Sequence, residues 1–140
     1  MFLKFDQVHY LPVLVAGLTA FFLGGMWYMA LFGKLWVRLH GFSEEKVKQM
    51  QARVPPPLFF GGMIAAYLVT AFVIALLVAS FDLKQPLDGL ILGSALFVLV
   101  TAVAFTGQLA SDRHYGIFAI DAAFYFVLLN FQGVLLTWWR

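Results

Sequence analysis

Asp121 is the one ionisable side chain that lies well inside a long apolar segment of this sequence. A carboxylate at membrane depth costs several kcal/mol unless it is paired, hydrated or protonated, so Asp121 indicates a polar site. Counting inward by equal depth along the other apolar segments brings several hydrogen-bond donors to the same layer. The predicted site consists of Asp121, Tyr28, Trp27, Tyr67, Gln108 and Tyr125. We expect the Tyr28 hydroxyl to hold the Asp121 carboxylate. The alternative is that these polar groups, together with Ser94, Thr101 and Gln132, only join one helix to another.

Other kinds of chemistry have little support in the sequence. His9, His40 and His114 fall at or outside the ends of apolar segments, and they lack carboxylates at metal-ligand spacing. There is no cysteine, which excludes thiolate ligands, disulfides and cysteine nucleophiles. The plausible parts of a Ser-His-Asp triad lie at different depths. We therefore expect no catalytic residues, no metal, no cofactor and no enzymatic activity.

The composition indicates a membrane protein. Of the 140 residues, 63% are hydrophobic and only 11% are charged, whereas a soluble domain carries about 25% charged residues. The excess apolar surface must face lipid. A net charge of +2 is too small to indicate nucleic-acid binding. The basic residues fit the headgroups of anionic lipids better.

The apolar segments predict an all-α protein with a single domain over residues 1–140. Each segment is long enough for about 30 Å of hydrocarbon. The predicted spans are residues 11–32, 58–80, 88–110 and 115–138. Short turns between the later spans predict a four-helix antiparallel bundle. The longest loop, residues 41–57, predicts a short amphipathic helix at the membrane surface, which begins at the N-cap Ser43.

Small residues recur along the spans and predict close contacts between helices, because they let backbones approach each other. The predicted packing residues are Ala16, Ala20, Gly24, Ala71, Ala75, Ala79, Gly89 and Gly93.

Lysine and arginine are distributed unequally over the two ends of the spans. Six of the nine lie in the loop between the first two spans or in the turn before the fourth. Because cytoplasmic loops carry the excess of these residues, we expect loop 41–57 to be cytoplasmic and both termini to be outside. The expected location is the bacterial inner membrane.

Residues 24–34, with the sequence GGMWYMALFGK, are followed by Trp36, Gly41 and Ser43-Glu44-Glu45. This run resembles the opening signature of the "domain of unknown function 1761" family, and Ile120-Asp121-Ala122 resembles its C-terminal part. The resemblance covers nearly the whole chain and is most specific over residues 24–45. It implies a small bacterial integral membrane protein with four helices. It supplies no activity, ligand or catalytic residue.

Two function classes follow from these observations. The first is a structural or accessory bundle that self-associates or packs against another membrane complex. The second is a small oligomeric transporter or channel with a polar site around Asp121. Broken helices at mid-membrane depth would favour transport. No proline interrupts a span, so the sequence favours the first class. The expected partners are membrane lipids and either a second copy of the chain or another membrane protein.

Overall fold

The computed structural model describes residues 2–140, and all the regular structure in that range is helical. The elements are η1 (Phe5–Gln7), α1 (Tyr10–Gly25), η2 (Met26–Leu31), α2 (Gly33–His40), α3 (Glu44–Arg53), α4 (Pro56–Ser80), α5 (Pro86–Leu109) and α6 (Tyr115–Trp138). Four helical segments are long and apolar enough to cross a membrane, namely Tyr10–Leu31, Pro56–Ser80, Pro86–Leu109 and Tyr115–Trp138. The prediction of an all-α chain with four long apolar helical segments is confirmed, and the ends of these segments differ from the expected ones by at most two residues.

The helix ends follow local rules. The Ser43 hydroxyl accepts a hydrogen bond from the Lys46 backbone N–H at 3.2 Å and so caps α3, as expected. A proline opens α4 and another opens α5, where the missing N–H costs nothing. The His114 ring caps α6 by accepting from the Gly116 N–H at 2.9 Å. Gly41, at φ 70°, ends α2 in the left-handed conformation that suits glycine.

The first apolar segment is less regular than its sequence predicts. Residues 26–31 form a π-helix, in which the Phe32 N–H reaches the Trp27 carbonyl at 2.8 Å. The helix then breaks at Phe32, and a separate helix, α2, begins at Gly33. A Cβ atom at position 33 would collide with the Tyr28 carbonyl, so the break depends on glycine. The apolar pattern of the sequence did not predict α2 as a separate helix.

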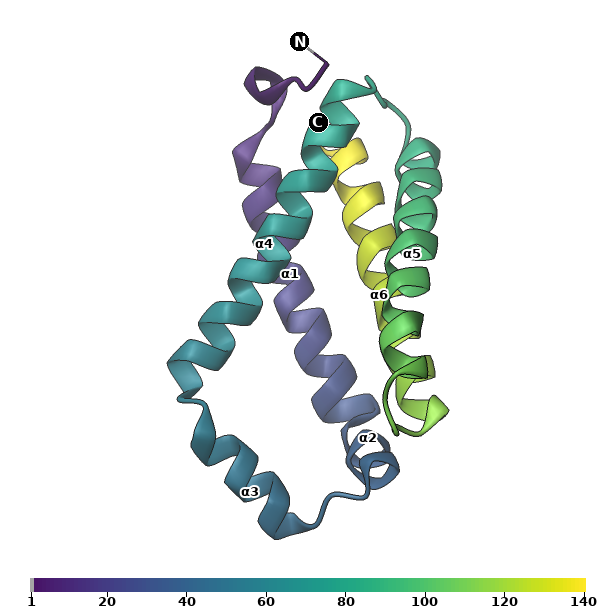
Figure 1. Ribbon diagram of the computed structural model, residues 1–140. Coiled ribbons are helices and arrows are strands. Elements are labelled where there is room, and N and C mark those ends of the chain that lie inside the picture. The colour runs from purple at the N-terminus through teal and green to yellow at the C-terminus, as the bar shows by residue number, and fades with distance from the viewer. Residues whose placement is uncertain (1) are drawn as a thin grey trace.

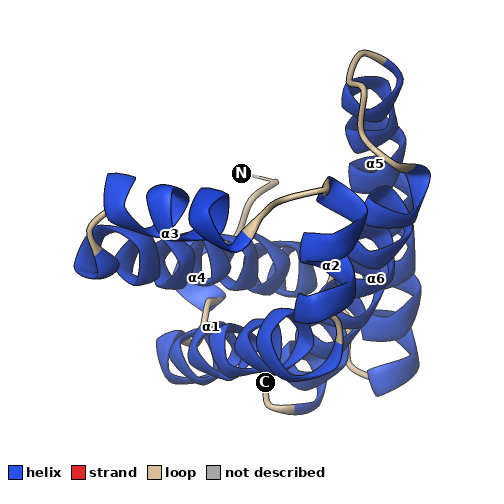
Figure 2. Ribbon diagram, turned by 90° about the horizontal axis from the view of Figure 1, so that it is seen from below, coloured by secondary structure: helices blue, strands red, loops and turns tan. Residues whose placement is uncertain are grey.

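The four long helices do not form a regular ring. Helix α6 is the central one: it packs against α5 and also contacts α1 and α4, while α1 packs mainly against α4 (Figures 1 and 2). The most apolar stretch of α6 is 44% buried, but that of α5 is only 11% buried. Helix α5 is therefore peripheral and packs chiefly against α6.

At one end of the contact between α5 and α6, the backbones of the two helices touch directly. Cβ atoms added to Gly89 or Gly133 would each collide with the carbonyl of the other residue. One turn further on, a Cβ on Gly93 would lie 2.6 Å from the Leu129 carbonyl oxygen. The two helices can approach this closely only because all three residues lack a side chain.

Between α1 and α4, alanines allow a similarly close approach of the two helices. Ala16, Ala20 and Ala71 have no exposed surface, and Ala75 and Ala79 are also buried. Ala16, Ala71 and Ala75 lie among Val13, Ile74, Val78, Leu129 and Leu136 in the main core, whereas Ala20 packs with Phe124 and Leu128 in a second cluster. Gly17 lets α1 pack directly on Leu68 of α4.

Both termini lie at one end of the molecule, with the turn between α4 and α5 (Figure 1). There Arg140 and Lys84 each contact the Asp82 carboxylate at 2.9 Å. Hydrogen bonds from Lys84 and Arg140 hold the pKa of Asp82 below its usual range. At the opposite end α1 and α4 diverge, and α2 and α3 connect them (Figure 1).

Candidate functional site

The Asp121 carboxylate of α6 is held by a tyrosine from the π-helix. The Tyr28 hydroxyl donates a hydrogen bond to Asp121 Oδ1 at 2.7 Å, and both side chains are half-buried. A π-turn adds a residue to the local helical repeat and so changes the direction of the side chains after it. The irregular segment Met26–Leu31 thus carries the residue that reaches the Asp121 carboxylate.

Trp27 binds the same turn of α6, but through the backbone. Its indole N–H donates to the Ile120 carbonyl at 3.3 Å. The rings of Trp27, Tyr28 and Tyr67 surround Phe124, with centroid distances of 5.9, 5.3 and 6.2 Å. Phe124 itself is 2% exposed. These aromatic contacts fix the turn that presents Asp121 and exclude water from one side of it.

The structure brings only part of the predicted set to the carboxylate. Tyr67 lies beside Gly24 and Phe124, where its backbone carbonyl accepts from Gln132 Nε2 at 3.2 Å. Tyr125 follows Asp121 by one turn of α6 and is half-buried. Among residues 2–140, Tyr28 is the one side chain that hydrogen-bonds to Asp121.

Gln108 lies elsewhere. It is buried at the end of α5, and its Nε2 donates to the Arg113 carbonyl at 2.7 Å, which ties the turn between α5 and α6. The sequence predicted Gln108 beside Asp121, because the two residues lie at a similar depth in their spans. In the structure the Gln108 amide binds the Arg113 carbonyl, which is only five residues away in the sequence.

A second polar contact joins α5 and α6 on the far side of α6. The Ser94 hydroxyl donates to Asn130 Oδ1 at 3.0 Å, and Asn130 Nδ2 donates to the Phe126 carbonyl at 2.9 Å. Sequence reasoning singled out Ser94 but missed Asn130. An asparagine deep inside an apolar helix was the available signal, because such a group needs a partner in lipid.

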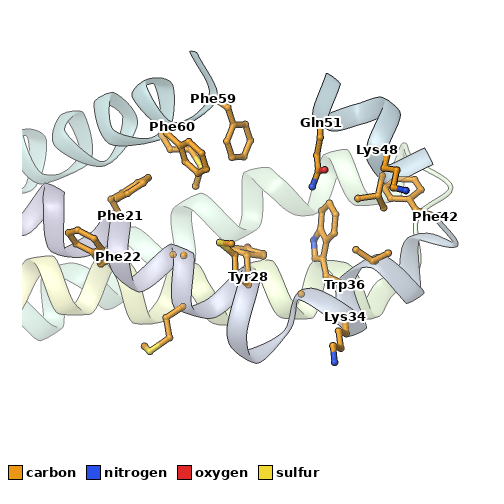
Figure 3. A pocket seen from close by; sticks show the side chains of 18 of the residues that line it. Phe21, Phe22, Tyr28, Lys34, Trp36, Phe42, Lys48, Gln51, Phe59 and Phe60 are labelled. Carbon is orange, nitrogen blue, oxygen red and sulfur yellow. The ribbon is translucent and has the colours of Figure 1, made fainter. Parts of the chain in front are cut away.

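A groove lies between the diverging ends of α1 and α4, and we refer to it as the α1–α4 groove. Its volume is about 1310 Å³, and residues of α1, η2, α2, α3 and α4 line it. Figure 3 shows Phe21, Phe22, Phe59 and Phe60 at one end and Trp36, Lys48 and Gln51 at the other. Tyr28 also lines the groove. Tyr28, whose hydroxyl binds Asp121, is thus also a residue of the groove wall.

This arrangement offers a carboxylate, a phenol hydroxyl and an adjoining apolar groove. Over the part of the chain that the structure describes, no three His, Cys, Asp or Glu residues gather as metal ligands. The carboxylate can accept a proton or bind a cation. The groove can hold an apolar molecule with a polar end.

These features define a class: an all-helical protein with four helices long and apolar enough to span a membrane, in which the half-buried carboxylate of Asp121 is bound by a tyrosine from another segment. The family described as "Protein of unknown function (DUF1761)" matches residues 11–137, and the chain belongs to that family. The resemblance seen in the sequence is thereby confirmed. No curated protein and no solved structure gives a significant match to the chain.

Proposed function

We propose that this chain is an integral membrane protein of the bacterial inner membrane that acts as a self-associating accessory bundle. Its four long helices cross the bilayer in antiparallel order, with loop 41–57 in the cytoplasm and both termini outside. It carries no catalytic site. Its role is to present helix surfaces to a second copy.

The observation that carries this proposal is the glycine pair at the start of α4. Glycine in a helix interior costs about 0.8–1.0 kcal/mol relative to alanine, so it needs a reason. Gly17, Gly24, Gly89, Gly93 and Gly133 have one, because a side chain there would collide with a neighbouring helix. A Cβ atom added to Gly61 or Gly62 would meet nothing within 4 Å; the same holds for Gly25 and Gly107, but Gly61 and Gly62 are adjacent and lie beside exposed alanines.

The glycine pair belongs to an exposed face of small residues. Gly61, Gly62, Ala65 and Ala66 are all exposed, and Gly61 and Ala65 stand one turn apart. Of the groove-lining residues in this part of α4, Met63 lies on the side of the helix opposite Gly61 and Ala65, whereas Phe59 stands one turn before Gly62. Small residues at this spacing let a second helix approach closely. A second copy of the chain at this face explains why glycine occurs there.

Gly61→Leu tests the proposal. The substitution should raise the thermal stability of the monomer, since leucine favours helix, but it should lower self-association at least about tenfold, because its side chain blocks the close approach. Self-association is measured by energy transfer between labelled copies in vesicles of fixed lipid composition.

Gly107→Leu is the matched control. Gly107 is exposed on α5 and also has no neighbour within 4 Å, but it lies outside the proposed face. The control should associate like the wild type. Equal association of wild type and Gly61→Leu, or no association at all, would contradict the proposal.

A second candidate function is transport through an oligomer by way of Asp121. The hydrogen bond from Tyr28 supports it, because the Tyr28 ring lines an open groove and also contacts the intramembrane carboxylate. A proton or a cation could reach Asp121 by displacing that one donor. The π-helix at this point is a further reason, since such turns are frequent at functional sites.

A further inference from the structure

We propose that the α1–α4 groove is a binding site for one anionic phospholipid of the cytoplasmic leaflet. The inference rests on the proposed insertion and orientation in the membrane, but it is independent of self-association through Gly61. The acyl chains lie between α1 and α4, and the headgroup lies beneath α3.

The groove has the depth of one leaflet. Phe21 and Met29, which both line the groove, are 8 residues apart, or roughly 12 Å at about 1.5 Å per helical residue, and α2 and α3 extend the groove beyond them. Half of a bilayer's hydrocarbon is about 15 Å thick, and the headgroup region lies beyond it. Beyond Phe21 the groove is closed, because Gly17 packs directly on Leu68. A transmembrane helix of a partner would need a groove through both leaflets, whereas a lipid needs only this one.

The walls change from apolar to basic along that depth. The inner part is lined by Phe21, Phe22, Met26, Phe59, Phe60 and Met63. Phe21 and Phe60 meet edge to face with ring centroids 6.0 Å apart, which closes the inner end. Figure 3 shows Lys48 and Gln51 extending from α3 toward the Trp36 side of the groove, and Lys34 at its rim.

The charges at the outer end have no partners in the described chain. Five cations lie in this part of the sequence, namely Lys34, Arg38, Lys46, Lys48 and Arg53, against two carboxylates, Glu44 and Glu45. Of these, Lys34, Lys48 and Glu44 line the groove. Among residues 2–140 the salt bridges are those of Asp82, at the other end of the molecule. The excess positive charge therefore suits an anionic headgroup.

The groove also contains an unsatisfied donor. The Trp36 indole N–H is buried and has no hydrogen-bond partner within residues 2–140. An unpaired buried donor is uncommon and calls for an acceptor. Trp36 lines the groove, and a phosphate oxygen there would supply that acceptor if the ring turned its N–H toward the groove. The volume, about 1310 Å³, exceeds the 300–1,000 Å³ typical of pockets for small ligands and suits a lipid with two chains.

The test uses the full-length protein, delipidated in mild detergent and then given equal amounts of phosphatidylglycerol and phosphatidylcholine with identical acyl chains. Native mass spectrometry counts the lipids that each chain retains. We expect one phosphatidylglycerol per chain. Retention of both lipids to the same extent would overturn the proposal, because it would show that the groove binds the acyl chains and does not distinguish the headgroups.

Two pairs of variants separate the groove from general effects. Lys34→Gln with Lys48→Gln should reduce retained phosphatidylglycerol at least about tenfold, since each basic residue near an anionic surface contributes about 1 kcal/mol. The control pair, Arg38→Gln with Lys46→Gln, removes the same charge from residues that do not line the groove. An equal loss in the control pair would overturn the proposal.

Gly25→Leu tests the apolar part. Gly25 lines the groove, and a Cβ there would meet nothing within 4 Å, so the fold tolerates leucine while the groove is filled. We expect Gly25→Leu to lose the lipid, and Gly107→Leu and Gly61→Leu to retain it. Lipid retention by Gly25→Leu would contradict the site. A chain that does not self-associate would leave the lipid result unchanged. Extraction of the chain from membranes by alkaline carbonate would refute the membrane insertion on which both proposals rest.

Discussion

At the residue scale, the Asp121 carboxylate depends on one side-chain donor that comes from a distorted turn. A hydrogen bond to a charged group contributes about 1.5–3 kcal/mol. The surroundings on the Phe124 side are aromatic and apolar, so loss of the Tyr28 hydroxyl leaves the carboxylate short of partners. Trp27 and Tyr28 both bind the turn of α6 at Ile120–Asp121, and together they join η2 to α6.

Tyr28→Phe should therefore lower the free energy of unfolding by about 1–3 kcal/mol, measured by denaturant titration in mild detergent. Asp121→Asn should cost less, because the amide oxygen can still accept from the tyrosine. Tyr125→Phe is the control: Tyr125 is also half-buried near Asp121, but it makes no hydrogen bond to the carboxylate. A loss in Tyr125→Phe as large as that in Tyr28→Phe would show that the bond itself contributes little.

The same variants decide whether the carboxylate also serves transport. Wild-type protein in vesicles should conduct protons under an imposed potential if Asp121 lies on a pathway, and Asp121→Asn should abolish that flux because it cannot ionise. The readout is a pH-sensitive dye trapped inside the vesicles. A wild-type flux equal to that of empty vesicles would remove proton transport from consideration and leave Asp121 a structural residue.

At the element scale, the close approach of α5 to α6 depends on three glycines, and the hydrogen bond between Ser94 and Asn130 adds a polar contact between the two helices. Gly133→Ala should destabilise the protein by about 1–3 kcal/mol, since the added methyl group collides with the Gly89 carbonyl and forces the two helices apart. Gly107→Ala, on the exposed side of α5, should instead be neutral or stabilise by up to about 1 kcal/mol. Unfolding in detergent measures both. Equal stability of the two variants would mean that α5 adjusts freely on α6.

At the scale of the whole molecule, the basic residues and the groove belong to the same end. Lys34, Arg38 and Lys48 lie on or beside α2 and α3, and the turn between α5 and α6 contributes Arg113 at that end (Figure 1). The other end carries Lys4, Lys84 and Arg140, of which the latter two are paired with Asp82. The free positive charge is thus concentrated where the lipid site is proposed, which is the side expected to face the cytoplasm.

Single cysteines test this orientation, since the native chain has none. A cysteine at Gln85 should react with an impermeant thiol reagent in intact cells, whereas one at Gln49 should react only after the cells are opened. Both positions are outside the long helices that would cross the membrane. Labelling at position 49 and not at position 85 would show the reverse orientation and would place the lipid site in the other leaflet.

Much of this molecule follows from local sequence alone. The apolar runs predicted the four long helices, Ser43 predicted the start of α3, and small residues such as Ala16 and Ala71 marked faces that are now seen to be buried. These properties depend on hydropathy, helical period and capping, all of which act between residues close in sequence. The Asp121 carboxylate could be singled out for the same reason, because a charge inside an apolar run is costly whatever its neighbours are.

Tertiary structure alone decided which donor binds Asp121, where α5 sits and where the groove opens. Counting residues along the spans predicted Tyr28 and Gln108 at the same depth. The depth of a residue does not determine how far its helix is rotated or at what angle it crosses its neighbours. Those angles come from the fit of distant surfaces, such as Gly89 against Gly133 and Gly17 against Leu68. The π-turn at Met26–Leu31 then rotates Tyr28 toward α6, and the divergence of α1 from α4 opens the groove beside it, so the site exists only once the helices have packed.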